Sequence, residues 1–115
     1  MKENIVVEKS YQFALKVIKL YQILQEQREF VLSKQVLRSG TSIGANIQEA
    51  TAACSRKDFH SKMSIASKEA RETHYWLRLL QDSKIGKIDY QDYLNEAKEL
   101  IAILSAIVKT IGQSK

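Results

Sequence analysis

Apolar residues recur at helical spacing along almost the whole chain, and no proline interrupts them. Within residues 7–27, four apolar side chains follow one another at spacings of four, three and four: Phe13, Val17, Leu20 and Leu24. This period places them on one face of an amphipathic helix. Ala14, Ile18 and Tyr21 widen that face, so we expect the helix to bury a broad stripe.

Capping residues mark where three further helices begin. Ser33 is a candidate N-cap for the second helix, because its hydroxyl can accept a hydrogen bond from a free backbone N–H. Ser55 and Asp58 have the spacing of a capping box at the start of the third helix. Asp89 can cap the fourth, after a turn in which Gly86 can close the preceding helix. These helices are expected over three ranges: 33–53, 55–83 and 89–112.

Four helices with short connections predict an all-α protein with the antiparallel up-down-up-down topology of a four-helix bundle. The 115 residues suffice for one domain, 1–115, that buries a core without disulfides or metal. Cys54 is the only cysteine, which excludes an internal disulfide and fits a reducing cytosol. The start "MKENIVVEKS" lacks a signal-peptide pattern, and no apolar run approaches the roughly 20 residues of a membrane span. We therefore expect a soluble cytoplasmic protein with no membrane contact and no cofactor.

Two of the expected helices carry more apolar residues than one stripe requires. The main stripe of the fourth is expected at Tyr90, Leu94, Ala97, Ile101, Leu104, Val108 and Ile111. The helix adds four apolar residues outside that stripe: Tyr93, Leu100, Ile103 and Ile107. The third adds Ile65, Trp76 and Leu79. Wide stripes are explained either by a thick core or by burial of the surplus between subunits. We expect a homo-oligomer.

The second helix contains two glycines, Gly40 and Gly44, in the stretch "LRSGTSIGANIQEA". Gly40 shares the core arc of Ile43 and Ile47, so it predicts a close helix approach inside the bundle. Gly44 lies off that arc and indicates a second close neighbour. The opposite arc holds few long charged side chains, which is more typical of an interface than of a solvated helix face. The candidate oligomer interface is Arg38, Ser42, Gly44, Asn46 and Glu49.

The third helix carries a row of basic and small polar residues, which we call the basic stripe. Spacings of four, three, four, three and four residues relate its members: His60, Ser64, Ser67, Arg71, His74 and Arg78. Cations one helical turn apart can follow phosphates, and the bordering Tyr75 can stack on an unpaired base. The alternative is a solvated face balanced by Glu69 and Glu72. The candidate nucleic-acid contacts are Lys57, His60, Lys68, Arg71, His74 and Arg78.

Net charge agrees with this assignment. The formal charge is +5, and residues 89–115 hold three basic against four acidic residues. The positive excess therefore lies entirely in residues 1–88, which include the basic stripe. A basic balance confined to part of a bundle favours a polyanionic partner.

Enzymatic chemistry is poorly supported by the same residues. A di-iron bundle needs Glu-x-x-His pairs, but Lys57 precedes His60 and Arg71 precedes His74 at that spacing. Two histidines and one cysteine on different faces do not make a zinc site. In bundle ribonucleases of the HEPN type, four to six residues lie between an arginine and the histidine that follows it. Arg56 and His60 enclose only three residues, so that spacing fails.

Two stretches together resemble a known family. "SKQVLRSGTSIGANIQEA" followed by "SRKDFHSKMSIASKEARETHYWLRLL" is similar to the four-helix-bundle family of 23S rRNA intervening-sequence proteins. The densest agreement includes Gln35, Asn46, Glu49, Asp58-Phe59 and Glu72. The resemblance implies a bacterial protein that assembles as a homopentamer. It also implies a relation to the accessory variability determinant of diversity-generating retroelements, which binds nucleic acid and a reverse transcriptase.

The leading hypothesis is a non-enzymatic, oligomeric protein that binds structured RNA through the basic stripe. One alternative is a protein-interaction scaffold, or an accessory subunit for a nucleic-acid enzyme such as a reverse transcriptase. A second alternative is a HEPN-like ribonuclease.

Overall fold

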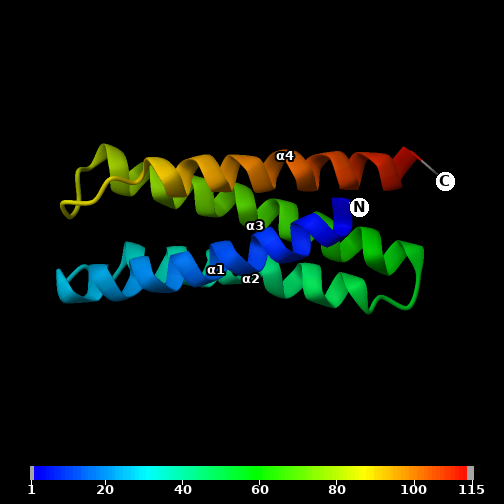
Figure 1. Cartoon of the computed structure of the whole chain (residues 1–115), viewed down its shortest axis with the longest axis horizontal. Helices are drawn as coiled ribbons and strands as arrows, with labels where there is room; N and C mark the ends of the chain where they lie inside the picture. The colour runs from blue at the N-terminus through cyan, green and yellow to red at the C-terminus, as the bar shows by residue number, and fades with distance from the viewer. Residues whose placement is uncertain (1, 114–115) are drawn as a thin grey trace.

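The computed structural model describes residues 2–113, which form four α-helices. They are α1 (Lys2–Glu26), α2 (Leu32–Thr51), α3 (Arg56–Asp82) and α4 (Gln91–Gln113). The helices run antiparallel along the long axis of a body measuring 48 × 21 × 21 Å (Figure 1). The α1–α2 and α3–α4 connections lie at one end and the α2–α3 connection at the other. The predicted up-down-up-down four-helix bundle is confirmed.

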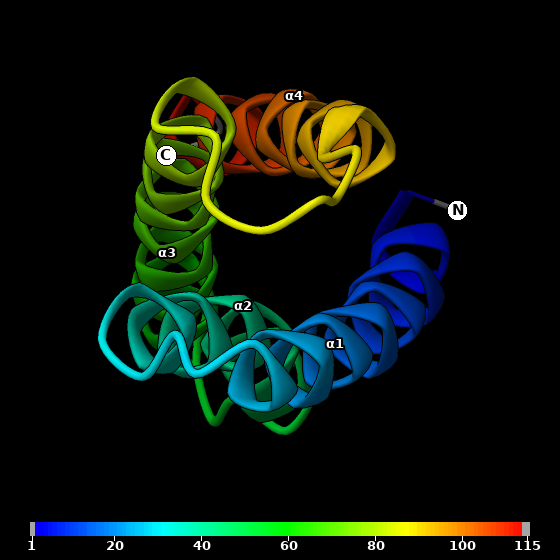
Figure 2. The ribbon, with the colours of Figure 1, turned by 90° about the vertical axis from the view of Figure 1, so that its left-hand side faces the viewer.

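Each helix packs against its neighbours in chain order, and α4 returns to α1 (Figure 2). The α1–α4 seam is the least extensive of the four. Two ion pairs bridge it, between Lys9 and Glu99 at 3.0 Å and between Lys16 and Glu96. The Lys16 ammonium also lies over the Tyr93 ring, 5.3 Å from its centroid, where a cation is attracted to the ring face.

The apolar stripe of α1 is buried as predicted, but it is narrower than expected. Its four anchor residues have no exposed surface: Phe13, Val17, Leu20 and Leu24. Ile18, which was expected to widen the buried stripe, is 39% exposed, and Tyr11 and Leu15 beside it are exposed as well. One face of α1 therefore presents apolar side chains to the outside of the chain.

The buried face of α4 differs from the predicted stripe. The predicted members Ile101, Val108 and Ile111 are only half-buried. Leu100 and Ile107, which the spacing assigned to a surplus, lie in the core. The buried arc of α4 is rotated toward α1, because α4 packs into the angle between α1 and α3. Some of the apolar side chains that seemed surplus to a single stripe are therefore buried within the chain.

The two glycines of α2 both face α1. A Cβ built on Gly40 would come within 2.9 Å of both methyl groups of Val17, so the predicted close approach inside the bundle is confirmed. Gly44 lies over the backbone of Ser10, and a Cβ there would be 3.5 Å from the Ser10 carbonyl oxygen. The second close neighbour that Gly44 indicated is thus already present within the chain.

The N-terminus of α2 is capped by a different residue from the one predicted. The backbone N–H groups of Val31, Leu32 and Ser33 all donate to the carboxylate of Glu29, over distances of 2.6 to 3.2 Å. Ser33 is not the cap. Its hydroxyl is buried and donates to the Glu29 carbonyl oxygen at 2.7 Å. A carboxylate that replaces three missing helix bonds also suits the positive end of the helix dipole.

The predicted start of α3 is confirmed, since Ser55 Oγ accepts a hydrogen bond from the Asp58 N–H at 3.0 Å. Asp89 also accepts as expected, from the Gln91 N–H at 3.0 Å. Gly86 adopts the predicted left-handed conformation, with a φ of 72°. These caps determine where α3 and α4 begin and therefore which of their faces meet.

Candidate nucleic-acid interface

The basic stripe of α3 lies along α4. Near the middle, Arg71 Nη2 donates to Ser105 Oγ at 3.0 Å. At the α2–α3 end, a Cβ on Gly112 would be 3.7 Å from His60 Nε2. At the opposite end, His74 and Arg78 share a cavity with residues of α4. Four α4 residues at seven-residue spacing therefore face the stripe: Gln91, Lys98, Ser105 and Gly112.

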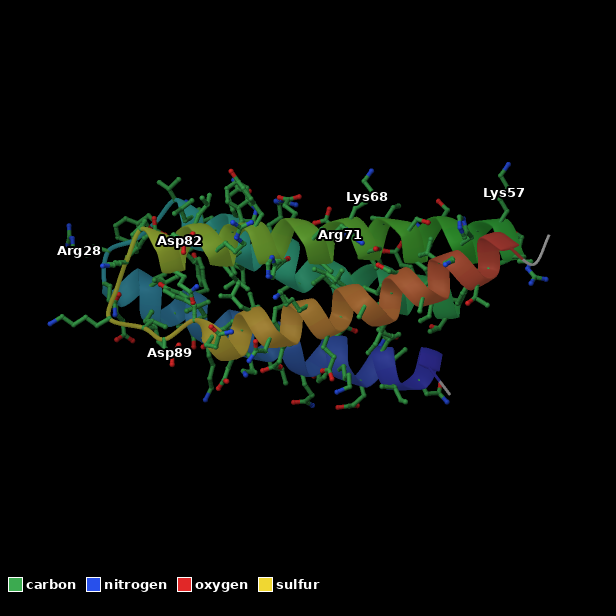
Figure 3. The ribbon with its side chains drawn as sticks, turned by 90° about the horizontal axis from the view of Figure 1, so that it is seen from above. Arg28, Lys57, Lys68, Arg71, Asp82 and Asp89 are labelled. Atoms are coloured by element: carbon green, nitrogen blue, oxygen red, sulfur yellow. The ribbon has the colours of Figure 1, made fainter. Side chains whose placement is uncertain are left out.

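This position divides the predicted contacts into two groups. Lys57, Lys68, Arg71 and Arg78 are exposed, whereas His60 and His74 are half-buried at the α3–α4 seam. Lys57 and Lys68 project from α3 away from α4, and Arg71 lies on the side nearer α4 (Figure 3). Two of the six predicted nucleic-acid contacts, the histidines, are therefore partly covered by α4.

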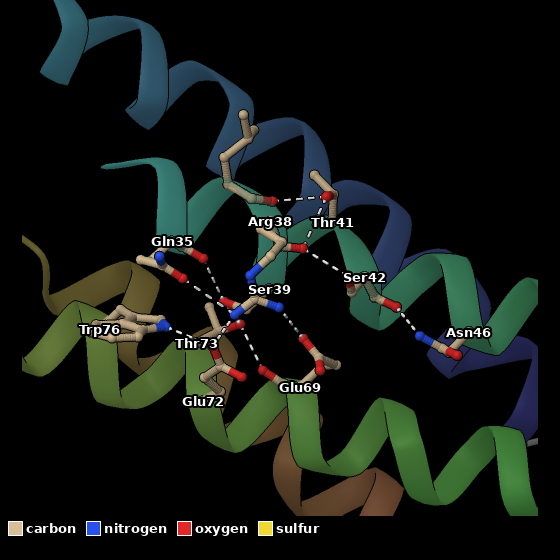
Figure 4. Close-up of polar contacts among 11 residues, drawn as sticks. Gln35, Arg38, Ser39, Thr41, Ser42, Asn46, Glu69, Glu72, Thr73 and Trp76 are labelled. Carbon is tan, nitrogen blue, oxygen red and sulfur yellow. Dashed lines mark hydrogen bonds and ion pairs between the residues drawn. The ribbon is translucent and has the colours of Figure 1, made fainter. Parts of the chain in front are cut away.

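The acidic residues of α3 do not neutralise the stripe. Arg38 of α2 forms ion pairs with both Glu69, at 3.2 Å, and Glu72 (Figure 4). Trp76 Nε1 also donates to Glu72 Oε2 at 2.9 Å. Both carboxylates are therefore directed toward α2. Arg38 therefore pairs with the two acids that were expected to balance the stripe. The choice between a solvated face and a nucleic-acid contact stays a prediction.

Two cations of α4 extend the stripe and were missed from the sequence. Lys98 lies in the cavity beside His74 and Arg78, and Lys109 is exposed four residues beyond Ser105. The bulk charge of residues 89–115 obscured them, because four acidic residues, Glu96 and Glu99 among them, outweigh three basic residues in the count. Those two acids lie on the other side of α4, paired with α1. The spacing of Lys98, Ser105 and Lys109 was the signal available in the sequence.

The environment of His74 favours its neutral form. Burial lowers the pKa of the His74 imidazole from its ordinary value, and the nearby charges of Lys98 and Arg78 lower it further. At neutral pH the ring is therefore uncharged, with one nitrogen as donor and the other as acceptor. The prediction of a cationic donor at this position holds only in more acidic solution.

A cavity lies at each end of the α3–α4 seam. One of about 540 Å³ is lined by α3 and α4 residues at the α2–α3 end: Arg56, Lys57, His60, Ile111 and Gly112. The other, of about 250 Å³, is lined mostly by polar groups: His74, Arg78, Gln81, Gln91, Leu94, Asn95 and Lys98. The structure thus places Arg56 and His60 at one cavity and His74 at another.

The candidate interface residues of α2 all have partners within the chain. Ser42 Oγ donates to the Arg38 carbonyl oxygen at 2.8 Å, and Asn46 Nδ2 donates to the Ser42 carbonyl oxygen at 2.9 Å. Glu49 pairs with Lys62 of α3 at 2.8 Å, and this contact raises the pKa of Lys62. Ser42 and Asn46 thus bond within α2, whereas Arg38 and Glu49 pair with α3 and Gly44 lies against α1. A contact with a second subunit at these residues stays a prediction.

Other chemistries have little support in the described part of the chain. Among residues 2–113, no three histidine, cysteine or acidic residues are grouped as metal ligands. Cys54 is exposed, with its sulfur 4.0 Å from Asp58. None of the four described helices combines the length and apolarity needed to cross a bilayer.

The fold defines an all-α four-helix-bundle protein, and comparison with known proteins places it more narrowly. The profile of the family described as "23S rRNA-intervening sequence protein" matches residues 2–106. A crystallised protein of unknown function from the S23 ribosomal protein family of Bacteroides thetaiotaomicron VPI-5482 is 51% identical. The two structures superpose with a TM-score of 0.89, over 95% of this chain and 99% of the other. No curated protein matches. The chain belongs to the 23S rRNA-intervening sequence protein family.

Proposed function

We propose that this protein is a non-enzymatic, oligomeric, cytoplasmic protein that binds structured RNA through the basic stripe of α3 and the adjoining cations of α4. The observation that carries the proposal is the separation of charge on α3. Arg38 holds Glu69 and Glu72 on the α2 side, which leaves Arg71 and Arg78 facing solvent. Exposed cations that are not paired with these two glutamates attract phosphates, and binding releases the counterions of the nucleic acid.

Contacts of this kind are individually weak, and several copies of the stripe in one assembly would multiply them. An apolar surface supports self-association. Tyr11, Leu15 and Ile18 are 56%, 44% and 39% exposed on α1. Beside them lies a cavity of about 220 Å³ bordered by Gly44 and other small residues of α1 and α2. Exposed apolar area of this extent on a small protein favours burial against another subunit.

The predicted homopentamer can be tested by light scattering on the purified protein. The expected mass is near five times 13.2 kDa. A monomer mass would contradict the assembly, although it would leave the basic stripe open to test.

The RNA-binding proposal is tested by reversing charge on the stripe. Arg71→Glu with Arg78→Glu should reduce affinity for structured RNA by at least a hundredfold and flatten its dependence on salt. A matched control is Lys19→Glu with Lys34→Glu, which makes the same change in net charge at exposed positions of α1 and α2. If the two double variants lose RNA affinity equally, binding is not specific to the basic stripe.

Absence of catalysis is part of the proposal and has its own test. The wild-type protein should leave labelled RNA intact over hours. Cleavage that is lost in His60→Ala would establish a ribonuclease instead.

A second candidate function is a scaffold or accessory subunit that docks a protein such as a reverse transcriptase. Tyr75 is exposed and its ring centroid lies 5.3 Å from that of the half-buried Trp76. This pair favours the scaffold, because such rings are enriched where proteins meet. Pull-down from lysate treated with nuclease separates the two functions. RNA cargo is lost under that treatment, whereas a directly bound protein remains.

A further inference from the structure

The cavity at the α3–α4 connection end is chemically unlike the rest of the basic stripe. Three carboxamide side chains line it, Gln81 from α3 and Gln91 and Asn95 from α4. Arg78 and Lys98 supply positive charge at the same cavity. Carboxamides carry no net charge that would attract phosphate, but they offer hydrogen-bond donors and acceptors in fixed pairs. Such pairs match the edge of a nucleobase.

We infer that this cavity binds a single unpaired nucleotide, with its phosphate on Arg78 and Lys98 and the edge of its base on the carboxamides. The inference rests on the proposed RNA-binding function and names the part of the RNA that the seam recognises. Proteins that read RNA sequence act mainly on unpaired bases, which they stack on flat side chains and bind along their edges.

A hydrogen bond within the cavity positions two of its carboxamides for such a ligand. Gln91 Nε2 donates to Asn95 Oδ1 at 2.9 Å. This bond orients both groups and leaves the Gln91 carbonyl oxygen as an acceptor beside the Asn95 N–H₂ donor. A glutamine or asparagine carboxamide pairs well with an adenine edge, through one donor and one acceptor.

An imidazole ring and an apolar side chain complete the site. The half-buried His74 ring and the buried Leu94 side chain line the same cavity, and both can contact the face of a base. The preceding connection is held by Tyr90, whose hydroxyl donates to the Ile85 carbonyl oxygen at 2.7 Å. Gln91 therefore starts from a fixed position. The volume of about 250 Å³ suits one base rather than a duplex.

The site also has a boundary. Asp82 follows Arg78 by one helical turn and lies with Asp89 at this end of the bundle (Figure 3). Negative charge there opposes the continuation of a phosphate chain. A strand that follows the seam would therefore place its last bound nucleotide in this cavity.

The test uses the full chain and follows side-chain amide resonances by NMR. The probes are the four nucleoside monophosphates, with ribose 5-phosphate as the matched ligand that lacks a base. The nucleotides should shift the amide resonances of Gln81, Gln91 and Asn95, with adenosine monophosphate shifting them most. Ribose 5-phosphate should leave these three resonances in place. Equal shifts from all five probes, or no shift, would overturn the inference.

A pair of charge-neutral variants separates this inference from RNA binding in general. Gln81→Ala with Asn95→Ala keeps the net charge, so mean affinity for the four homopolymers should change less than about threefold, with the salt dependence intact. The preference among homopolymers should fall on the order of tenfold, toward equality. An unchanged preference would overturn the nucleotide site while the proposed function stands. If wild-type protein binds no RNA, the proposed function fails, whatever the mononucleotides do.

Discussion

Gly40 of α2 lies directly against Val17 of α1, and a Cβ on the glycine would come within 2.9 Å of both valine methyl groups. Both residues are fully buried or nearly so. The distance between α1 and α2 is therefore set at a point where one helix contributes no side chain. The close approach of α1 costs α2 roughly 1 kcal/mol in helix propensity, because glycine is a poorer helix former than alanine.

Gly40→Ala should destabilise the protein. Overpacking a filled core typically costs about 1–3 kcal/mol, more than the roughly 1 kcal/mol gained in helix propensity. Chemical unfolding of the variant measures the loss. In a Val17→Ala background the cost should shrink, because the clashing methyl groups are gone. An equal cost in both backgrounds would show that Val17 is not the obstacle.

Gly44→Ala should behave in the opposite way. Its Cβ would meet Ser10 at 3.5 Å, an ordinary contact distance, so the monomer fold should gain up to about 1 kcal/mol from helix propensity. Unfolding and light scattering are measured together, since assembly contributes to apparent stability. Unchanged mass with higher stability would place Gly44 outside the subunit contact. A smaller mass would place it inside.

Arg38→Gln should weaken RNA binding although Arg38 lies on α2, off the basic stripe. Without Arg38, the carboxylates of Glu69 and Glu72 lose their ion-pair partner and repel phosphate. The expected loss is several-fold in affinity, with stability changed by about 1 kcal/mol or less because these pairs are partly exposed. Lys34→Gln, an exposed lysine on the same helix, is the control for losing one charge. Similar losses in both variants would contradict the role of Arg38.

His74 should make the folded state sensitive to mild acid. Its folded pKa is lowered, so below the ordinary value of 6.5 the unfolded chain takes up a proton first. The free energy of unfolding is thus expected to fall as pH drops below 6.5 toward the folded pKa. Urea unfolding at several pH values should show a shallower fall in His74→Gln. Identical slopes in the two proteins would contradict a neutral, partly buried His74.

The helical period and the capping residues sufficed to predict four helices, their order and their antiparallel packing. A helix boundary depends on local hydrogen bonds, so Ser55 with Asp58 could be recognised directly. The stripe of α1 could be recognised because its apolar residues keep one azimuth over several turns. The members of the basic stripe could be placed on one face from the sequence because all of them belong to one helix, but their contact with nucleic acid stays a prediction.

Tertiary packing decided what local patterns could not. Arg38 of α2 draws Glu69 and Glu72 toward itself, which depends on how α2 and α3 lie relative to one another. The same holds for the cavity between α3 and α4, where Gln81 and Lys98 meet although 17 positions separate them in the chain. The sequence determines on which side of its own helix each residue lies. Which neighbouring helix that side faces is decided only when the four helices pack together.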